Sequence, residues 1–520
     1  MSGPANLLWR RRDLFGLAAL GVAGTLAVPR PAWCDPDAAF DVRSFGAVGN
    51  GSAIDSPAIN KAIDAAAAAG GGTVRIPSGS YVCQSIRLKS YVALLLEPGA
   101  NLLASPSGGF DAAEPDGPLA KYQDFGHGHW HNSLIWGDGV HDVAILGPGL
   151  IWGRGLQRGR PASQVPGAGN KAIALKNCRN VILRDISIRE AGHFGILATG
   201  VDNLTIDNLR IDTNRDGMNI DCCRNVRIAK CSVNSPTDDG ICLKSSLALG
   251  TLRPTEDVTI SDCYVTGGYA VGALLDGSFR RFTGPTVPTG RIKLGTESNG
   301  GFRNITVTNC VFESCRGFAL ESVDGGVVED ITITGITMRD IRNAPFFLRL
   351  GARLRGPAGG KVGTLRRVII SNVTCNAPQN TMPAIIDGIP GHPIEDISIR
   401  DVYLVQKGGG TAQQAAVTPP EEERLYPEPS AFGPLPAQGL FARHVRDLEV
   451  NHLEIASAAP DARPFVWLGD VDRADFFFLR LPPDATAPAF QFTNVRHVRV
   501  ENSTPLADIT VAAVAHGKLP

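Results

Sequence analysis

Three aspartates lie in two short segments whose residue types and spacing suit acid–base chemistry. The segments are Asp216-Gly217-Met218-Asn219-Ile220-Asp221 and Asp239-Gly240-Ile241-Cys242-Leu243-Lys244, with Asp238 directly before the second. Each begins five or six residues after an inward apolar residue. Asp216 and Asp239 are therefore predicted to stack on neighbouring strands, about 4.8 Å apart. Carboxyl groups this close repel one another, so at least one is expected to stay protonated near neutral pH.

Grouped carboxyl groups of this kind are what glycoside hydrolysis requires. One carboxylic acid protonates the leaving oxygen, and another carboxylate activates water or attacks the sugar. The same aspartates could instead form a ladder of turns or a calcium site. The acidic segments alone therefore leave catalysis and these structural roles open.

A cationic segment favours the catalytic interpretation. In Arg291-Ile292-Lys293 the two cations share one face of a predicted strand, Ile292 faces the other way, and Glu297 has the same parity as the cations. Arginine and lysine side by side can hold a sugar carboxylate, because arginine offers a planar two-point fork. Seen in isolation, the same pattern would more often be a solvated strand face.

Histidines supply a further set of candidate ligands. His127, His129 and His131 alternate around Trp130, and His193 aligns about one coil before Asp216. Alternating histidines could bind a metal, but a loop with an aromatic residue can also bind sugar, and we favour a substrate-side or structural loop with no metal or cofactor. His193 could contact substrate or hydrogen-bond to the backbone. We therefore keep His131 and His193 as candidate substrate-binding residues.

A repeat shows which elements position these side chains. Each copy has a polar residue, then apolar-x-apolar, two or three spacer residues and apolar-x-apolar again. Copies begin at Asp142, Asn180, Asn203, Asn225, Asp257, Asn304, Asp330, Arg367, Asp396, Asp447 and His497, and the shortest intervals are 22 to 29 residues. Alternation marks strands with one buried face, and a fixed period in the twenties marks a solenoid. Because no helical pattern separates the strands, the sequence predicts a parallel β-helix.

One helix and one loop stand out from the repeat. Residues 55–70 have a capping residue, Pro57 in the first turn and Gly70 at the end, which predicts a helix that covers one open end of the solenoid. The proline-rich residues 417–436 predict a surface loop between late coils.

The cysteines point to a packed interior. The chain has 11 cysteines, and Cys231, Cys263 and Cys310 align in one inward slot of the repeat. Free cysteine behaves as a small buried hydrophobic residue, so mainly core thiols are favoured. Disulfides between neighbouring coils remain the alternative in an exported protein.

Overall composition limits the classes of protein. The 520 residues include 50 Lys and Arg and 51 Asp and Glu, for a net charge of -1. This balance excludes a broadly basic nucleic-acid-binding protein and gives no polybasic membrane signal. The length divided by ~150 suggests about three domains, but an all-β chain of this length can form a single solenoid.

The N-terminus is predicted to be a targeting segment. Arg10, Arg11 and Arg12 precede an apolar run at residues 14–28, which is shorter than the ~20 residues of a membrane span. The pattern is typical of a twin-arginine signal peptide, with an uncleaved anchor as the alternative. We therefore expect a signal peptide at residues 1–34 and one β-helix domain at residues 35–520. The expected product is a bacterial, periplasmic or extracellular monomer without membrane contact after cleavage.

Taken together, these segments resemble glycoside hydrolase family 28, the polygalacturonase and rhamnogalacturonase family. Its signature is Asn-Thr-Asp, Asp-Asp, Gly-His-Gly and Arg-Ile-Lys in that order. Asn214-Arg215-Asp216-Gly217 resembles the first element with Arg215 in place of Thr, Asp238-Asp239-Gly240 matches the second, and Arg291-Ile292-Lys293 matches the fourth. The opening Phe45-Gly46-Ala47-Val48-Gly49-Asn50-Gly51 also looks like the start of pectin-degrading β-helix enzymes. The resemblance covers about residues 40–410.

The third signature element departs from the family. Residues 269–277 stand where Gly-His-Gly is expected, and coil alignment places Val271 in the slot after Asp239. The missing histidine weakens the resemblance to a typical endo-polygalacturonase. Rhamnogalacturonan-type members of the family also lack it.

The resemblance implies a right-handed, single-stranded parallel β-helix of the pectin-lyase type with an N-terminal capping helix. It also implies an inverting hydrolase of pectic polysaccharide or oligosaccharide. Asp238 would be the general acid, Asp216 and Asp239 would hold and deprotonate the attacking water, and Arg291 and Lys293 would bind a galacturonate carboxylate.

Two other functions remain open. A pectate-lyase-like β-eliminase on the same fold would need calcium and a basic residue that abstracts a proton. A carbohydrate-binding or adhesive solenoid would need no catalysis, and the missing histidine slightly favours it. Endo or exo action would depend on loops that close one end of the groove, such as residues 105–136 and 247–255.

Overall fold

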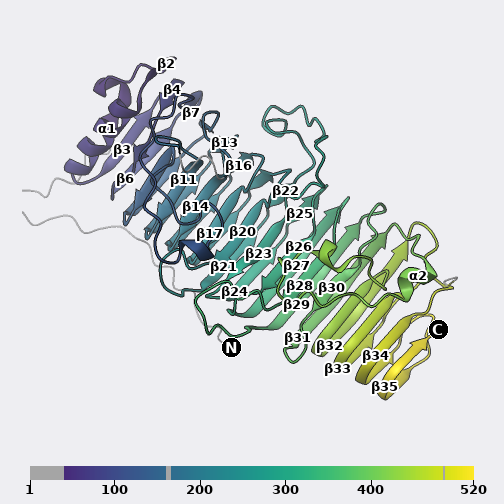
Figure 1. Cartoon of the computed structure of the whole chain (residues 1–520). Helices are drawn as coiled ribbons and strands as arrows, with labels where there is room; N and C mark the ends of the chain where they lie inside the picture. The colour runs from purple at the N-terminus through teal and green to yellow at the C-terminus, as the bar shows by residue number, and fades with distance from the viewer. Residues whose placement is uncertain (1–39, 160–164, 484–485) are drawn as a thin grey trace, which may run out of the picture.

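The computed structural model describes residues 40–159, 165–483 and 486–520, so the predicted signal peptide lies outside the described residues. Its strands stack coil upon coil into one elongated solenoid, with α1 (Ser56–Ala68) at one end and β35 (Ile509–Leu519) at the other (Figure 1). Nearly all strand pairs are parallel, which confirms the predicted parallel β-helix. None of the helices in the described ranges is long and apolar enough to cross a membrane.

Three ladders of parallel strands form the walls of the solenoid. The first ladder contains β5 (Ile86–Arg87), β8 (Ile135–Asp138), β11 (Lys171–Lys176), β14 (Phe194–Thr199), β17 (Met218–Asp221), β20 (Ile241–Ser245), β23 (Ile292–Ser298), β26 (Phe318–Ser322), β28 (Phe346–Leu350) and β30 (Ala384–Asp387). The second contains β1 (Phe40–Asp41), β3 (Gly72–Ile76), β6 (Val92–Leu96), β9 (His141–Leu146), β12 (Arg179–Arg184), β15 (Asp202–Asp207), β18 (Arg224–Ala229), β21 (Thr255–Ser261) and β24 (Phe302–Thr308). The third contains β2 (Asn50–Ile54), β4 (Gly79–Cys83), β7 (Ala100–Ala104), β10 (Leu150–Trp152), β13 (Ser187–Arg189), β16 (Arg210–Asp212), β19 (Ser232–Asn234), β22 (Tyr264–Thr266) and β25 (Val311–Glu313).

Later coils merge the ladders into long strands. These are β27 (Val327–Arg339), β29 (Thr364–Asn376), β31 (Ile394–Gln406), β32 (Leu440–Ser457), β33 (Val466–Phe477) and β34 (Phe490–Glu501). The final strand β35 pairs with β34 in the antiparallel direction. This last pairing covers the C-terminal edge, which would otherwise expose unpaired backbone groups.

The backbone conformation explains why a polar residue begins each repeat. All eleven of these residues have a left-handed backbone, with φ between 51° and 61°. Asparagine and aspartate tolerate this conformation better than other side chains do. Their side chains also join the coils, because the Asn203 amide donates to the Asn180 side chain at 2.8 Å and the Asn225 amide donates to Asn203 at 2.7 Å.

The interior is filled by the apolar positions of the repeat and by cysteines. Cys231, Cys263 and Cys310 are at most 1% exposed. The ten cysteines in the described ranges are all buried and free, which confirms the prediction of core thiols for these residues. Cys34 lies outside the described residues.

The predicted capping helix is confirmed in α1. Its Ile59, Ala62, Ile63 and Ala66 are at most 1% exposed and face the core. The 3₁₀ turn η1 (Val42–Phe45) packs beside it.

Two excursions leave the ladders near the aspartates. Residues 105–134 lie between β7 and β8 and contain the 3₁₀ turn η2 (Ala120–Tyr122). Residues 407–439 lie between β31 and β32 and contain α2 (Ala412–Ala415) and the 3₁₀ turn η4 (Pro429–Phe432).

Candidate active site

Asp216 and Asp239 lie before β17 and β20, two neighbouring strands of the first ladder. The register of these strands places the two aspartates opposite each other, and the Gly217 N–H donates to the Asp239 carbonyl at 3.0 Å. A Cβ atom on Gly217 would lie 2.4 Å from the Gly240 carbonyl oxygen. Glycine after each aspartate therefore lets the two coils stack closely at the point where the acids emerge.

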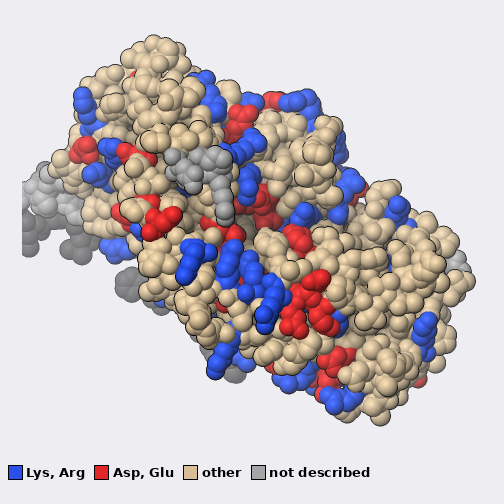
Figure 2. All heavy atoms as spheres, in the orientation of Figure 1, with Lys and Arg blue, Asp and Glu red and all other residues tan. Residues whose placement is uncertain are grey.

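The structure brings all three predicted aspartates together. One carboxyl oxygen from each of Asp216, Asp238 and Asp239 lies within 4.8 Å of the other two. Asp216 and Asp239 are each 5% exposed, whereas the Asp238 side chain is 27% exposed. Figure 2 shows acidic side chains in a hollow in the middle of this face, with lysine and arginine side chains on both sides.

Asp239 is held as a carboxylate by two cations. Arg291 Nε donates to Asp239 Oδ1 at 2.8 Å, and Lys293 Nζ lies 3.5 Å from Asp239 Oδ2. Burial alone would favour the neutral acid, but Lys293 and Arg291 together outweigh it and lower the pKa of Asp239 well below its usual range. The predicted shared face is present, since Ile292 between the two cations points into the core.

The surroundings of Asp216 shift its pKa in the opposite direction to that of Asp239. Burial and then the neighbouring Asp238 raise the pKa of Asp216 well above its usual range. Within the described ranges, no ion pair reaches the Asp216 carboxyl. Asp238 instead pairs with Arg215, whose Nη2 lies 2.5 Å from Asp238 Oδ2. Of the two buried acids, Asp216 is therefore the one whose protonated form is favoured.

Arg291 and Lys293 are covered rather than exposed to the groove. They are 2% and 1% exposed. Behind them, Glu321 lies 3.4 Å from Lys293 Nζ and 3.8 Å from Arg291 Nη2. In front, Lys293 Nζ donates to the Tyr426 hydroxyl at 3.1 Å, and Arg291 Nη2 donates to Glu428 Oε1 at 3.2 Å. A substrate carboxylate cannot reach these cations in this arrangement.

His193 lies beside the acidic segments without an ion pair to them. Its ring makes edge contacts with Phe125 and Phe194 at 4.9 and 4.5 Å, and it is 4% exposed. Burial, followed by the charge of Arg215, lowers the pKa of His193 to about 2, so the imidazole is neutral. The strand register aligns His193 with Arg215, one position before Asp216.

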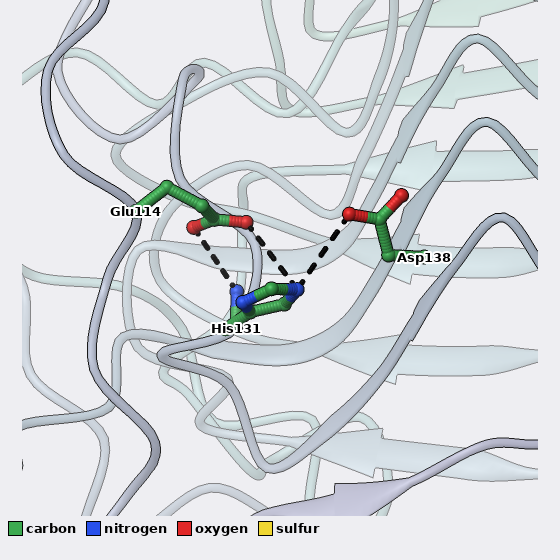
Figure 3. A group of neighbouring side chains, drawn as sticks. All are labelled: Glu114, His131 and Asp138. Carbon is green, nitrogen blue, oxygen red and sulfur yellow. Dashed lines mark hydrogen bonds and ion pairs between the residues drawn. The ribbon is translucent and has the colours of Figure 1, made fainter.

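His131 belongs to a different cluster. Its Nε2 lies 3.7 Å from Glu114 Oε1 and 3.6 Å from Asp138 Oδ2 (Figure 3). Its ring contacts that of Trp136 in a tilted arrangement, with the centroids 4.1 Å apart, and Lys176 lies 3.5 Å from the same oxygen of Asp138. This donor set could hold a cation, but Lys176 already supplies positive charge there. Over the described ranges, no hydrogen bond or ion pair connects this cluster to the three aspartates.

The predicted position of Val271 is wrong. β20 pairs next with β23, and the residue opposite Asp239 in that register is Gly290. Residues 267–290 leave the ladder, and the Leu274 N–H donates to the Asp212 carboxylate at 2.8 Å. Counting along the repeat failed because this excursion delays the next strand. The position that follows Asp239 in the stack therefore carries no side chain.

Sequence reasoning missed the residues that surround the cations. Glu321 lies on β26, and Tyr426 and Glu428 come from residues 407–439, more than 130 residues after Lys293. No local pattern in the sequence marks them. Lys244 and Glu297 form a buried ion pair of 2.6 Å. Lys244 ends the second acidic segment and Glu297 shares the strand face of Arg291 and Lys293, so strand alternation in the sequence could have suggested this pair.

Comparisons with known proteins agree with this architecture. Two family descriptions match the chain: "Right handed beta helix region" over residues 163–283 and "Rhamnogalacturonase A/epimerase, pectate lyase-like" over residues 39–108. A probable polygalacturonase from Vitis vinifera is 25% identical over 391 residues, which cover 69% of this chain and 73% of that protein. A mannuronan C5-epimerase from Azotobacter vinelandii is 31% identical over 182 residues, which cover 34% of this chain and 9% of that protein.

A solved structure shares the fold over most of its length. The family 28 exopolygalacturonase from Yersinia enterocolitica has a TM-score of 0.55 and 18% identity, and the match covers 90% of this chain and 79% of that one. The solved structure shows the shared fold, a right-handed parallel β-helix, and the similarity to a probable polygalacturonase supports the resemblance of this chain to the polygalacturonase-like hydrolases of glycoside hydrolase family 28.

Proposed function

We propose that this chain hydrolyses glycosidic bonds in a galacturonate-containing pectic polysaccharide, either polygalacturonan or rhamnogalacturonan. The observation that carries the proposal is the group of three aspartates within 4.8 Å of one another, with opposite pKa shifts on Asp216 and Asp239. When the pKa values of neighbouring carboxyl groups shift in opposite directions, one site can supply both an acid and a base. The similarity to a protein described as a probable polygalacturonase supports the substrate class.

The roles follow from exposure and charge. Asp238 is the most exposed of the three, so it is the proton donor to the leaving oxygen. In the structure Arg215 Nη2 lies 2.5 Å from Asp238 Oδ2. When a sugar carboxylate attracts Arg215, which is 35% exposed, Asp238 takes the proton from Asp216.

Proton transfer then closes the cycle. Asp238 passes its proton to the leaving oxygen as the bond to the anomeric carbon breaks. A water held between Asp216 and Asp239 attacks that carbon, and its proton returns to Asp216. Asp239 stays ionised throughout because Arg291 and Lys293 remain its partners.

Inversion of configuration comes from the family resemblance. Carboxyl groups of inverting enzymes commonly stand about 6.5–9.5 Å apart, which leaves room for water. The nearest carboxyl oxygens here lie within 4.8 Å, a distance between atoms that is shorter than the distance between the groups. The proposal that the reaction inverts the anomeric configuration therefore rests on the family resemblance.

Product analysis tests the proposal directly. The purified protein would be incubated with polygalacturonate and, separately, with rhamnogalacturonan, and the new reducing ends would be followed by NMR. We expect saturated products whose first-formed anomer is inverted relative to the cleaved bond. An unsaturated product that absorbs in the ultraviolet and disappears with chelator would instead establish the lyase. Binding without any cleavage would establish the carbohydrate-binding alternative.

Export is part of the same proposal. The arginines at positions 10–12 and the apolar run at residues 14–28 support a twin-arginine signal. A polysaccharide substrate outside the cell would require such a route. Fractionation of a bacterial host with and without residues 1–34 tests it, and equal export of both forms would contradict it.

A further inference from the structure

The segment between α2 and β32 reaches far back along the solenoid. We call residues 419–432 the strap. Its first part is held by late coils, since Arg443 Nη1 donates to the Pro419 carbonyl at 2.8 Å and Arg349 Nη2 donates to the Glu421 carbonyl at 2.6 Å. In Figure 1 the green segment beyond α2 lies over β26 and β28. The strap therefore connects the C-terminal coils to the coil that carries Arg291 and Lys293.

The far end of the strap places a carboxylate on the predicted substrate-binding cations. Glu428 Oε1 accepts from Arg291 Nη2 at 3.2 Å and from Arg316 Nη1 at 2.6 Å. Beside it, the Tyr426 ring lies 5.2 Å from Lys293 Nζ, and its hydroxyl accepts from the same atom. These contacts satisfy the sides of both cations that Asp239 leaves free.

Glu428 has the chemistry of a galacturonate carboxylate. Arg291 uses Nε for Asp239 and Nη2 for Glu428, and Glu321 lies 3.8 Å from the same Nη2, so three carboxylates already surround one guanidinium. A further carboxylate at this fork would meet like charge at close range, which is unfavourable. A sugar carboxylate can bind here only if Glu428 leaves.

The strap is held at both ends, so its tip, the part between them that includes Glu428, can leave the cations while the ends stay attached. Phe432 is buried and packs on Phe347 at 6.3 Å, and Arg349 lies over its ring. Between the two anchors, Leu425 and Tyr426 are 52% and 48% exposed, whereas Pro427 and Pro429 on either side of Glu428 are buried. Exposed segments with few buried contacts open at low cost, so we expect the strap to yield first at residues 424–426, next to Glu428.

We propose that Glu428 occupies the carboxylate subsite of the free protein and that a galacturonate carboxylate displaces it on binding. This inference rests on the proposed function, because it takes galacturonate as the ligand of Arg291 and Lys293. Glu428 is then a specificity residue: an acidic sugar replaces its charge on Arg291 and Arg316, and a neutral sugar does not.

Binding of galacturonate, which is not turned over, tests the inference separately from catalysis. Calorimetric titration would compare the full chain with Glu428→Gln and with Glu422→Gln, a matched change on the same strap at a side chain that forms no ion pair within the described residues. We expect Glu428→Gln to bind galacturonate about 5- to 100-fold more tightly, in the usual range of coupled binding. Glu422→Gln should bind it as the parent does, and galactose affinity should not change in either variant. Unchanged or weaker galacturonate binding by Glu428→Gln would overturn the inference.

Hydrogen exchange on the unmodified chain gives a second readout that does not depend on a variant. Saturating galacturonate should increase exchange in peptides from residues 422–430, because the tip loses its contacts. Unchanged exchange or greater protection of these peptides would overturn the inference. Absence of hydrolysis with polygalacturonate, by contrast, would count against the proposed function and leave these binding results to stand alone.

Discussion

Asp216 and Asp239 occupy the same position on neighbouring coils and are equally buried, yet their pKa values move in opposite directions. Asp239 faces the next coil, which supplies Arg291 and Lys293. Asp216 faces Asp238 and forms no ion pair within the described ranges, so burial and Asp238 outweigh the more distant charges of Arg215 and Lys244. The register of a β-helix thus fixes where a side chain stands, while the adjacent coil decides its protonation.

Loss of turnover is the largest effect expected at this pair. Asp216→Asn or Asp238→Asn should abolish turnover, with kcat reduced by about 10²–10⁴-fold or more, because each removes a group that carries a proton in the cycle. Reducing ends released from polygalacturonate measure the rate. Circular dichroism should show an unchanged fold, since neither change removes a partner of a buried cation. Near-normal activity in either variant would sink the catalytic assignment.

Stability should separate the two acids next. Asp239→Asn leaves buried Arg291 and Lys293 without their shared carboxylate, which should lower the free energy of unfolding by about 3–5 kcal/mol. Asp216→Asn should cost far less at pH 7, because asparagine resembles the neutral acid that burial already favours. Urea unfolding measured for both variants tests the contrast. Equal destabilisation would show that the two carboxyls have the same surroundings.

The pH dependence of stability should also differ in sign. The raised pKa of Asp216 means that the folded chain keeps a proton which the unfolded chain loses above about pH 4, so its contribution falls as pH rises. The lowered pKa of Asp239 means that its contribution is present above about pH 4 and is lost in acid.

The Asp216→Asn variant isolates the first of these two effects. Its stability relative to the parent should rise between pH 4 and pH 7, by at most about 1.4 kcal/mol per pH unit. Unfolding curves at four pH values would measure this difference. A stability of Asp216→Asn that falls relative to the parent as the pH rises from 4 to 7 would contradict the protonated assignment of Asp216.

Much of this architecture could be predicted from the sequence because its signals are local. The left-handed conformation at the start of each coil favours Asn or Asp, so Asn180, Asn203 and Asn225 show the register of the coils in the amino-acid sequence. Asp216 and Asp239 follow from that register, because they stand five and six residues after an inward apolar residue.

The remaining features depend on segments that leave the register. The excursion at residues 267–290 displaced the predicted position of Val271, because its length is set by contacts such as Leu274 with Asp212 and not by the repeat. Glu428 reaches Arg291 through a fold-back across several coils, which no periodicity encodes. His131 was assigned from a local histidine pattern, but its partners Glu114 and Asp138 hold it in another cluster.

Arg215 should give the smallest effect and the finest test of the comparison. Its charge lowers the pKa of Asp216 and pairs with Asp238, so Arg215→Thr, the residue of the family signature, removes the ion-pair partner of Asp238 and leaves the charge of Lys244 near Asp216. The alkaline limb of kcat/KM, which reports the free enzyme, should then move up by as much as about one pH unit. KM for polygalacturonate should rise as well, because Arg215 no longer meets a sugar carboxylate. Arg303→Thr, the same change at an exposed site on β24, should alter neither quantity. An alkaline limb that stays in place in Arg215→Thr would show that this arginine does not control the proton, and that Asp216 owes its protonation to burial and to Asp238.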